Sequence, residues 1–358
     1  MQMMRVAIIG QGRSGRDIHG KFFRSSSNDF CRVVCIVEED AFRAQRAAEE
    51  FGCDVVSDYT QLFGREDIDL VVNASYSQMH YTITRDLLRH GFNVLCEKPF
   101  GRTYFECLDL INTAKKHKVT VAAFHQTLFS PAFLKACDII NSGKLGEVFQ
   151  ISLRYSGFAR RWDWQTLQSK CAGSLYNSGP HPVGQALAFL GWDADTRVAF
   201  SSLRSILTSG DSDDYAKVIL TAPNKPVVDI EVNSVDAYAG DFVFKLCGSK
   251  GTYSSTNSDY KLKYIPDFSV YPQRPVQTKF IENERREPAY CSEKLEFCEE
   301  SGNIEGTSFD SAVLDFYRMM YAAVMEGKPL TVTPEMAAQV IRVIAQAHAD
   351  NPLPVLFD

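Results

Sequence analysis

The first third of the chain alternates short apolar runs with segments whose apolar residues recur every three or four positions. The runs are rich in β-branched residues and apolar throughout, which is typical of strands buried on both faces. The intervening segments have the periodicity of amphipathic helices, so the pattern predicts βαβ units and a parallel sheet covered on both sides. The predicted strands are residues 5–9, 33–37, 70–74, 93–96 and 120–124, and the predicted helices include residues 40–51, 78–90 and 104–117.

The pattern changes after about residue 147, where longer runs alternate in part and are separated by turns. Such runs predict a largely antiparallel sheet with one face toward helices. Two amphipathic segments follow, 308–327 and 333–350, and Thr333 before Pro334 is typical of a helix start. Residues 266–303, rich in Pro, Tyr, Phe and charge, form either a lid or a surface excursion, and we expect the excursion. The predicted strands here are 148–155, 197–206, 216–221, 227–235 and 242–247.

The alternation in segment 148–155 bears on assembly. Residues of opposite parity in a strand point to opposite faces of the sheet. We expect the outer face to keep apolar residues, and an uncovered apolar face binds a partner. The sequence therefore predicts a homodimer or homotetramer. One face carries Phe149, Ile151, Leu153 and Tyr155, and the other carries Val148, Gln150, Ser152 and Arg154.

Composition narrows the class of protein. A chain of 358 residues with 45% hydrophobic residues has the length of two globular domains. A net charge of -6 argues against nucleic acid or an anionic membrane as the main partner. No apolar run is long enough for a signal peptide or a membrane span. The ten cysteines lack the spacing of metal ligands, and Cys31 and Cys35 belong to a predicted strand, where we expect packing. We therefore expect a cytoplasmic protein with reduced thiols and no metal.

A glycine-rich turn, "VAIIGQGRSG", connects the first predicted strand to a helix. Gly10 allows the tight turn, Gly12 lets the backbone approach a pyrophosphate, and Gly15 allows close packing of helix on strand. The helix start then offers free N–H groups to the phosphates. The pattern predicts a dinucleotide-binding Rossmann domain, which we place at residues 1–125, with an α+β domain at 126–358 whose last helices can pack back on the first. The turn residues expected to bind are Gly10, Gln11, Gly12, Arg13, Ser14 and Gly15.

An acid follows the second predicted strand in "CIVEED". Glu38 has the position of a carboxylate that accepts hydrogen bonds from the adenosine ribose. A 2′-phosphate there would bring like charges together, at a cost on the order of 4 kcal/mol at an intermediate dielectric. The sequence therefore favours NAD over NADP, with Arg13 partly offsetting the repulsion. The alternative is that Glu38 is an exposed acid at the start of the next helix.

An acid and a base end the fourth long apolar run in "NVLCEKPFGRT". Ligands of open α/β sheets lie beyond the carboxyl ends of the strands, where Lys98 is expected. Pro99 keeps the preceding Lys98 out of the helical region. A lysine held beside a nicotinamide can polarise a substrate oxygen, and a lowered pKa would let it share proton transfer. The alternative is a solvated Glu97–Lys98 pair at the strand end.

These motifs occur in a recognisable order: the glycine turn, "NASYSQMH", "VLCEKP", "FHQTLFSPAF", "SGKLGEV" and "GSLYNSGPHP". In this order the chain resembles the Gfo/Idh/MocA family, which includes glucose-fructose oxidoreductase and inositol dehydrogenase. The resemblance implies an N-terminal Rossmann domain and a C-terminal domain on a large, mostly antiparallel sheet, one face of which commonly forms a dimer interface. It also implies that Lys98 lies by the nicotinamide and that its bond to Pro99 is cis.

The resemblance further implies an acid and a histidine four residues apart at the start of a helix. His181 has the histidine position, and Asn177 stands where many members carry aspartate. At helical spacing both face the same way. We expect His181, near its ordinary pKa of about 6.5, to accept the proton of an alcohol. Asn177 cannot take a proton but can hydrogen-bond a sugar hydroxyl. The alternative for His181 is simple packing at a helix start.

The segment "FARRWDWQ" is expected to be a loop beside the nicotinamide. Its tryptophans can stack on a sugar ring or a nicotinamide, and its charged residues can bind hydroxyls; a dimer contact is the alternative. Thr127 and Leu128 stand where many members carry an arginine, so an anchor for an anionic substrate is missing. The loop residues expected to bind substrate are Arg161, Trp162, Asp163 and Trp164. The further residues that the resemblance places at the cofactor are Ser75, His80, Glu97, Lys98 and Gln126.

Together these motifs predict an NAD(P)-dependent oxidoreductase. Hydride would move between a nicotinamide and a hydroxyl or carbonyl carbon of a sugar, polyol or derivative, with Lys98 and His181 as catalytic residues. One alternative is an NAD-dependent glycoside hydrolase of the same fold, which oxidises, eliminates and re-reduces with no net redox change. The other is a dinucleotide-binding regulator without turnover, which Asn177 in place of an acid keeps open.

Overall fold

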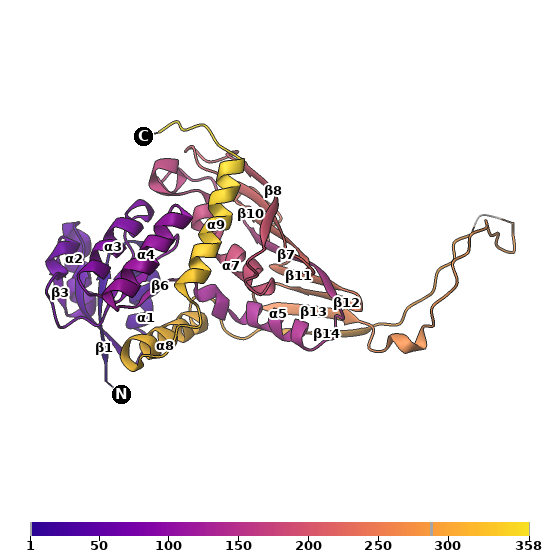
Figure 1. Cartoon of the computed structure of the whole chain (residues 1–358), viewed down its shortest axis with the longest axis horizontal. Helices are drawn as coiled ribbons and strands as arrows, with labels where there is room; N and C mark the ends of the chain where they lie inside the picture. Colours follow the sequence, from indigo (N-terminus) through magenta and orange to yellow (C-terminus); the bar gives the residue numbers. More distant parts are fainter. Residues whose placement is uncertain (1, 287–288, 358) are drawn as a thin grey trace.

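The computed structural model of the chain describes residues 2–286 and 289–357 and contains two sheets (Figure 1). The first is parallel throughout, with strand order β3-β2-β1-β4-β5-β6, as expected for a Rossmann domain. The short strand β3 was not predicted. The strands are β1 (Met4–Ile9), β2 (Cys31–Val37), β3 (Asp54–Val56), β4 (Leu70–Asn73), β5 (Val94–Cys96) and β6 (Val121–Ala123).

Helices connect these strands, and two of them begin directly after a residue whose side chain caps the first turn. Asp40 accepts a hydrogen bond from the Arg43 amide, and Thr103 accepts one from the Glu106 amide, so each satisfies a free N–H of a first turn. The segment after the glycine turn is wound as a π-helix before it becomes α-helical. The helical segments are η1 (Arg13–Gly20), α1 (Lys21–Phe23), α2 (Ala41–Phe51), η2 (Tyr59–Leu62), η3 (Ser77–Met79), α3 (His80–Arg89) and α4 (Tyr104–His117).

The second sheet has the strand order β14-β13-β12-β11-β7-β10-β9-β8. Every neighbouring pair is antiparallel except β7 and β10, which confirms the expected mostly antiparallel sheet. The last three strands in sequence were not predicted. The strands are β7 (Val148–Ser156), β8 (Arg197–Arg204), β9 (Tyr215–Thr221), β10 (Val227–Asn233), β11 (Phe244–Gly248), β12 (Gly251–Ser255), β13 (Asp259–Tyr264) and β14 (Cys298–Asn303).

Helices cover only one face of the second sheet (Figure 1). Ile151 and Leu153 of β7 are fully buried on that covered face, whereas Gln150 is exposed on the other. We expected the apolar side of β7 to contribute to an uncovered surface. This expectation is wrong, because the side chains on that side are buried in the core beneath the helices. The helical segments of this part are η4 (Gln126–Phe129), α5 (Pro131–Asn141), η5 (Trp164–Thr166), η6 (Gln168–Lys170), α6 (Ser174–Asn177) and α7 (Pro180–Phe189).

The two C-terminal helices join the sheets. In α8 (Ser311–Glu326), Tyr317 stacks on Phe22 with ring centroids 4.6 Å apart, so this helix packs on the Rossmann side. The last helix, α9 (Pro334–Asp350), contacts α4, α7, β6 and β8. It begins at Thr333, which accepts a hydrogen bond from the Met336 amide, with Pro334 in the first turn as predicted. None of the helices in the described residues is both long and apolar enough to cross a membrane.

The connection between β13 and β14 projects far from the body of the molecule (Figure 1). Its described residues are mostly exposed and hold one short helical turn, η7 (Phe268–Val270). Residues 287–288 lie outside the described part of the chain. The segment 266–303, which we expect to be a surface excursion, is therefore an excursion over most of its described length. Its end, Cys298–Asn303, joins the sheet as β14.

Candidate active site

The site begins at the carboxyl ends of β1 and β4, where the strand order of the parallel sheet reverses. Ligands of open α/β sheets bind at this point. Gly10 follows β1 with a φ of +88°, and a Cβ there would lie 2.6 Å from the Ala74 carbonyl oxygen. A Cβ on Gly15 would lie 1.9 Å from the Gly10 carbonyl oxygen. Only glycine fits at these two positions, so the turn packs tightly against η1 as predicted.

The residues next to this turn suit a dinucleotide. A Cβ on Gly12 would meet no atom within 4 Å, so the backbone is open to an approaching group. Among the described residues, the side-chain carbonyl oxygens of Gln11, Gln78 and Gln126 are buried without a hydrogen-bond partner. Buried polar groups are normally paired, so these oxygens are suited to donors of a bound ligand. Arg13 and Ser14 lie at the start of η1, where free backbone N–H groups favour phosphate.

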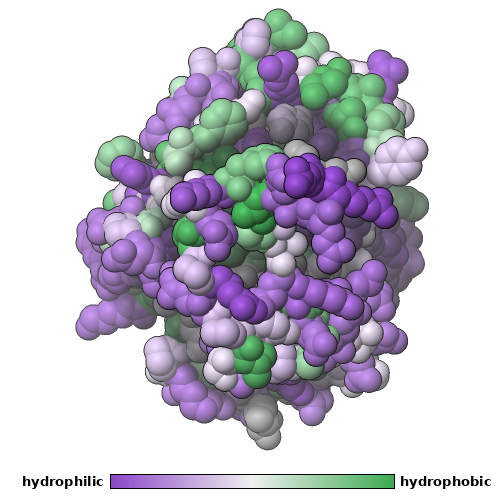
Figure 2. Space-filling model, turned by 90° about the vertical axis from the view of Figure 1, so that its right-hand side faces the viewer, coloured by the Kyte–Doolittle hydropathy of each residue, from purple (hydrophilic) through white to green (hydrophobic). Residues whose placement is uncertain are grey.

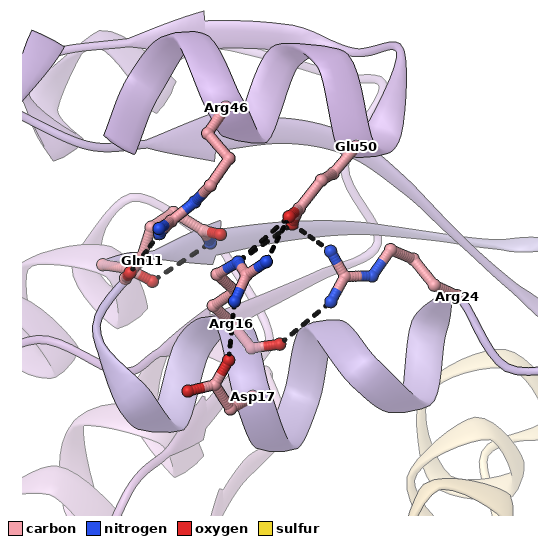
Figure 3. A network of polar contacts seen from close by, with 7 residues as sticks. Gln11, Arg16, Asp17, Arg24, Arg46 and Glu50 are labelled. Carbon is pink, nitrogen blue, oxygen red and sulfur yellow. Dashed lines mark hydrogen bonds and ion pairs between the residues drawn. The ribbon is translucent and has the colours of Figure 1, made fainter. Parts of the chain in front are cut away.

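A polar network holds the turn against α2 (Figure 3). Arg46 donates to the Gln11 carbonyl oxygen at 3.3 Å. Arg16 donates to Glu50 at 2.6 Å, and Arg24 donates to the same carboxylate. Because these residues come from η1, α2 and the turn after α1, the network fixes the glycine turn in one position.

Glu38 is buried rather than exposed, which rules out its alternative reading as a solvated acid. Its carboxylate accepts hydrogen bonds from the Gln11 amide at 2.8 Å, the Asp40 amide at 3.0 Å and the Arg43 guanidinium at 2.8 Å. Burial alone would raise the pKa of Glu38, but these hydrogen bonds lower it below its ordinary value. Glu38 is therefore a charged acid at the end of β2, and Arg43 partly neutralises it.

Two loops of the site are joined by His80. Its Nδ1 lies 2.8 Å from the Pro99 carbonyl oxygen and its Nε2 lies 3.1 Å from the Ser75 carbonyl oxygen. Burial lowers the pKa of His80, so the ring is neutral and donates through one nitrogen at a time. The structure places His80 beneath the site, where it links the loop after β4 to the loop after β5 instead of offering a ring nitrogen to a cofactor. Ser75 lies at the edge of the crevice, with its hydroxyl donating to Asn73.

Lys98 follows β5 and is joined to Pro99 by a cis peptide bond, as the resemblance implied. Its ammonium group donates to Asn177 twice, to the backbone carbonyl oxygen at 2.8 Å and to the side-chain oxygen at 3.2 Å. Burial lowers the pKa of Lys98, the negative charge of Glu97 opposes this, and the positive charges of Arg13 and Arg161 add to the lowering. Lys98 and Asn177 are both predicted site residues, and the structure brings them into direct contact.

Glu97 is turned into the protein and does not face the crevice. One carboxylate oxygen lies 3.0 Å from His19 Nε2, and the other accepts a hydrogen bond from the Lys98 amide at 3.0 Å. Burial would raise the pKa of Glu97, but the hydrogen bond from His19 and the charge of Lys98 hold it at about 2. Glu97, which was expected to hold the cofactor, is therefore a buried anion in contact with the backbone of Lys98.

His181 lies in the first turn of α7. A helix break at Ser178 separates α6 from α7, so Asn177 and His181 do not share one helix as expected. His181 Nδ1 lies 3.1 Å from the Thr127 hydroxyl, and the ring stacks beside Tyr155. Burial lowers the pKa of His181 to about 3, with the charge of Lys98 adding to it, so the expected value near 6.5 is wrong. The imidazole is neutral at physiological pH.

The loop after β7 places some of its predicted residues at the site and others on the surface. Arg161 pairs with Asp163 at 2.8 Å, and Gln165 reaches the Asn177 side-chain oxygen at 3.4 Å. Trp164 packs edge-on against Tyr76 at 5.1 Å, beside the loop after β4. Trp162 is 78% exposed.

A cavity of about 400 Å³ opens at the carboxyl ends of β7 and β10. Its size and mixed lining suit a small polar molecule. Tyr155 lines it and also stacks beside His181, and Ser178 brings the helix break to its wall. Further lining residues include Asn233, Asp236 and Tyr238. Sequence reasoning missed this cavity, because the residues come from separate strands and no local motif links them.

Asp213 also escaped sequence reasoning, although "DSDD" is an unusual cluster of carboxylates. The side chain of Asp213 is fully buried and accepts a hydrogen bond from the Leu175 amide at 2.7 Å, at the start of α6. Burial raises its pKa to about 7. Because α6 ends at Asn177, Asp213 helps to set the position of the residue that contacts Lys98. In the described residues, no group of three or more His, Cys, Asp or Glu is arranged to hold a metal ion.

Comparison with known families decides the classification. Residues 4–125 match the oxidoreductase family with an NAD-binding Rossmann fold, and residues 133–254 match the C-terminal domain of the same family. The chain belongs to the GFO/IDH/MocA family. Its N-terminal domain is therefore the NAD-binding Rossmann domain of an oxidoreductase family, which confirms the family and fold expected from the motifs.

Curated relatives cover much of this GFO/IDH/MocA chain at moderate identity. An oxidoreductase of Schizosaccharomyces pombe is 27% identical over 260 residues, 71% of this chain and 70% of that protein. Inositol 2-dehydrogenase 2 of Saccharopolyspora erythraea is 28% identical over 255 residues, 70% of this chain and 73% of that protein. The 2,7-anhydro-N-acetylneuraminate hydratase of Mediterraneibacter gnavus is 29% identical over 180 residues, 49% of this chain and 47% of that protein.

Solved structures of similar proteins share the fold over nearly the whole chain. A 3-ketoreductase from Actinomadura kijaniata in complex with NADP and TDP-benzene aligns with a TM-score of 0.79, 17% identity and 98% coverage of both chains. An NAD-binding protein from Listeria innocua aligns with a TM-score of 0.79, 20% identity and 98% coverage of both chains. At these identities the likeness concerns the fold.

Proposed function

We propose that the protein is an NAD(P)-dependent dehydrogenase or reductase that acts on a CH–OH or carbonyl group of a sugar, a polyol or a close derivative. The observation that carries this proposal is the contact of Lys98 with Asn177, near His181, whose ring stacks beside Tyr155 of the 400 Å³ cavity. The likeness to an inositol 2-dehydrogenase over 70% of the chain supports a polyhydroxylated substrate.

The residues divide the chemistry of such a transfer between them. A bound nicotinamide would accept the hydride from the substrate carbon. Lys98 would donate a hydrogen bond to the substrate oxygen and stabilise the negative charge that develops there. His181 is neutral, so when its Nδ1 donates to Thr127 its Nε2 would accept the hydroxyl proton. Asn177 would hold Lys98 and bind a second substrate hydroxyl.

The cofactor is proposed to be NAD in preference to NADP. Glu38 at the end of β2 is charged, and a carboxylate there accepts from the ribose hydroxyls and repels a 2′-phosphate. Arg43 donates to Glu38 and reduces that repulsion, so we expect a preference and not an exclusion. The A. kijaniata 3-ketoreductase of the same fold is in complex with NADP, so the fold by itself does not decide between the two nucleotides.

A second candidate is a reaction without net redox change, in which a substrate is oxidised, undergoes elimination and is reduced again. Two relatives named 2,7-anhydro-N-acetylneuraminate hydratase favour it, one from M. gnavus and one from Escherichia coli at 22% identity. The same Lys98 and His181 would serve this chemistry. Product formation without a change in nicotinamide absorbance identifies it.

The test combines the bound nucleotide with turnover. Mass spectrometry of the nucleotide released on denaturation identifies the cofactor and its redox state, and a panel of sugars and polyols is screened by nicotinamide absorbance. Lys98→Ala should abolish most turnover, while Lys116→Ala, an exposed lysine of α4, should keep it. A protein that binds the nucleotide but turns over no member of the panel, by absorbance or by product, would point to the regulator instead.

A further inference from the structure

Three buried polar side chains form a chain of hydrogen-bond contacts that leads to Lys98. Glu97 lies next to Lys98 in sequence and is 3% exposed. Its carboxylate lies 3.0 Å from Nε2 of His19, which comes from η1 behind the glycine turn. His19 Nδ1 lies 2.6 Å from the hydroxyl of Tyr317 in α8. Residues far apart in sequence therefore form one chain of contacts. This chain reaches Lys98 at its backbone amide, which donates to Glu97.

The surroundings of this chain are apolar. His19 and Tyr317 are both fully buried. The His19 ring lies 4.4 Å from the Phe124 ring, and the Tyr317 ring stacks on Phe22 at 4.6 Å. Polar groups in such surroundings depend on one another, because water cannot replace a lost partner.

The protons of the chain can be assigned from its two ends. Glu97 is a carboxylate, since its pKa is about 2, so it accepts from His19 Nε2–H. Burial raises the pKa of Tyr317 well above its ordinary value, so its phenol keeps the proton and donates to His19 Nδ1. With a single ring proton, His19 satisfies both contacts in only this one tautomer. The Tyr317 hydroxyl thereby selects the tautomer that points an N–H at Glu97.

The charge of Glu97 matters for Lys98. Among the charged groups that act most strongly on Lys98, Glu97 stabilises the ammonium form, whereas Arg13 and Arg161 disfavour it. The nearby imidazoles of His80, His125 and His181 have pKa values lowered by burial and are neutral. A Glu97 that lost its hydrogen bond from His19 would be buried with one oxygen unpaired, which favours its protonation.

We propose that His19 and Tyr317 are positioning residues for Lys98, acting through Glu97: they keep the Glu97 carboxylate ionised and fixed in orientation next to Lys98. The proposal rests on the proposed function only in giving Lys98 a chemical role. It makes α8, a helix from the far end of the chain, part of the catalytic apparatus. A purely structural role in the aromatic cluster would affect folding stability and leave the titration of Lys98 unchanged.

The test measures the titration of Lys98 directly, without substrate. Competitive labelling of lysines with acetic anhydride across pH, read by peptide mass spectrometry, gives the midpoint for Lys98. Glu97→Gln and His19→Leu should lower this midpoint by about one pH unit or more, because the stabilising charge is removed or weakened. Tyr317→Phe keeps the stacking on Phe22 and should lower it by a smaller amount. His19→Gln can still donate to Glu97 and should restore most of the wild-type midpoint.

Tyr321→Phe is the matched control, because it makes the same change in the same helix. Its hydroxyl donates to the Gln2 carbonyl oxygen and has no contact with Glu97, so the Lys98 midpoint should stay unchanged. Once a substrate is known, the limb of the kcat/KM profile assigned to Lys98 should move in the same direction. A Lys98 midpoint that is equal in wild type, Glu97→Gln and Tyr317→Phe would overturn the proposal, even if melting temperatures fall. If the Lys98 midpoint shifts in these variants but the protein transfers no hydride, the proposed function would be overturned. The role of the network in setting the titration of Lys98 would then stand.

Discussion

The side chains that meet at the carboxyl end of β5 differ in what they can do with a proton. Lys98 has a lowered pKa and therefore exchanges protons more readily than an ordinary lysine. His181 is neutral at every physiological pH, since its pKa is about 3. The amide of Asn177 can only hydrogen-bond. At the scale of residues, proton transfer and binding are therefore separable by mutation.

Replacing each of these residues should give a different kinetic signature. His181→Ala should lower kcat by about 10² to 10⁴, the usual cost of losing a positioned proton-transfer group, with cofactor affinity mostly kept. Asn177→Ala should mainly raise KM, as expected for lost uniform binding. His117→Ala, an exposed histidine of α4, is the control. Steady-state kinetics from pH 6 to 9 should also show no limb near 6.5 due to His181. A His181→Ala enzyme with the wild-type rate across this range would show that His181 is not the proton acceptor.

Cofactor choice depends on Glu38 and its partner Arg43. Glu38→Ala removes the charge that repels a 2′-phosphate, so the ratio of NADP to NAD affinity should rise. Arg43→Ala removes the neutralising partner and should shift the ratio the other way. Calorimetry with both nucleotides measures the two ratios. A wild-type protein that prefers NADP would contradict the assignment of Glu38.

At the scale of elements, the short helix α6 connects a carboxylate to the site. Asp213 accepts from its first turn and Asn177 ends it. Asp213 lies 3.7 Å from His348 of α9, whose pKa is lowered to about 4 by burial. Two buried groups with opposite shifts thus meet where α6, α9 and the loop before β9 pack together.

Asp213 should make stability depend on pH. Its pKa is raised from 3.8 to about 7 on folding, so the folded state binds more protons than the unfolded state between these values. Its contribution to stability is therefore present below about pH 4 and lost as pH rises through 7. Asp213→Asn removes this titration, so the melting temperature of the variant relative to wild type should rise from pH 4 to 7. His348 titrates with the opposite sign in part of this window, which is why the difference between the two proteins is measured. Parallel melting curves at all pH values would contradict the buried, protonated carboxyl.

At the scale of the whole molecule, the described helices leave one face of the second sheet uncovered (Figure 1). The excursion before β14 projects from the side of the molecule that Figure 2 shows. The surface on this side is mainly hydrophilic with hydrophobic patches. Phe200 of β8 and Val227 of β10 belong to the uncovered face and are 52% and 44% exposed. Apolar side chains of this size on an open sheet favour burial against a second copy.

We propose a dimer through this face. Phe200→Glu places a charge on the uncovered face and should shift the protein toward the monomer. Phe105→Glu changes a phenylalanine of α4 that is 80% exposed and should leave the assembly intact. Light scattering at micromolar concentration reads the mass of each. A wild-type monomer would count decisively against the dimer.

The sequence by itself determined the features that depend on local chemistry. Gly10 and Gly15 had to be glycine because a Cβ would collide with the backbone, and the parallel pairing of the first sheet followed from buried runs separated by helices. Thr333 and Pro334 marked the start of α9. Lys98 was found because a cis proline peptide after an acid and a base is a local motif that the family shares.

Only the tertiary structure decided the environment of each group. The pKa of His181 is about 3 and not 6.5, because burial among Lys98, His125 and Tyr155 is a property of packing and not of the motif. The face of β7 that became core was decided by α5 and α7, whose positions the alternation in one strand does not contain. His19, Glu97 and Tyr317 meet across nearly 300 residues of sequence because α8 folds back onto the Rossmann sheet. Contacts at such separation depend on the whole chain being folded, which is why no local pattern predicts them.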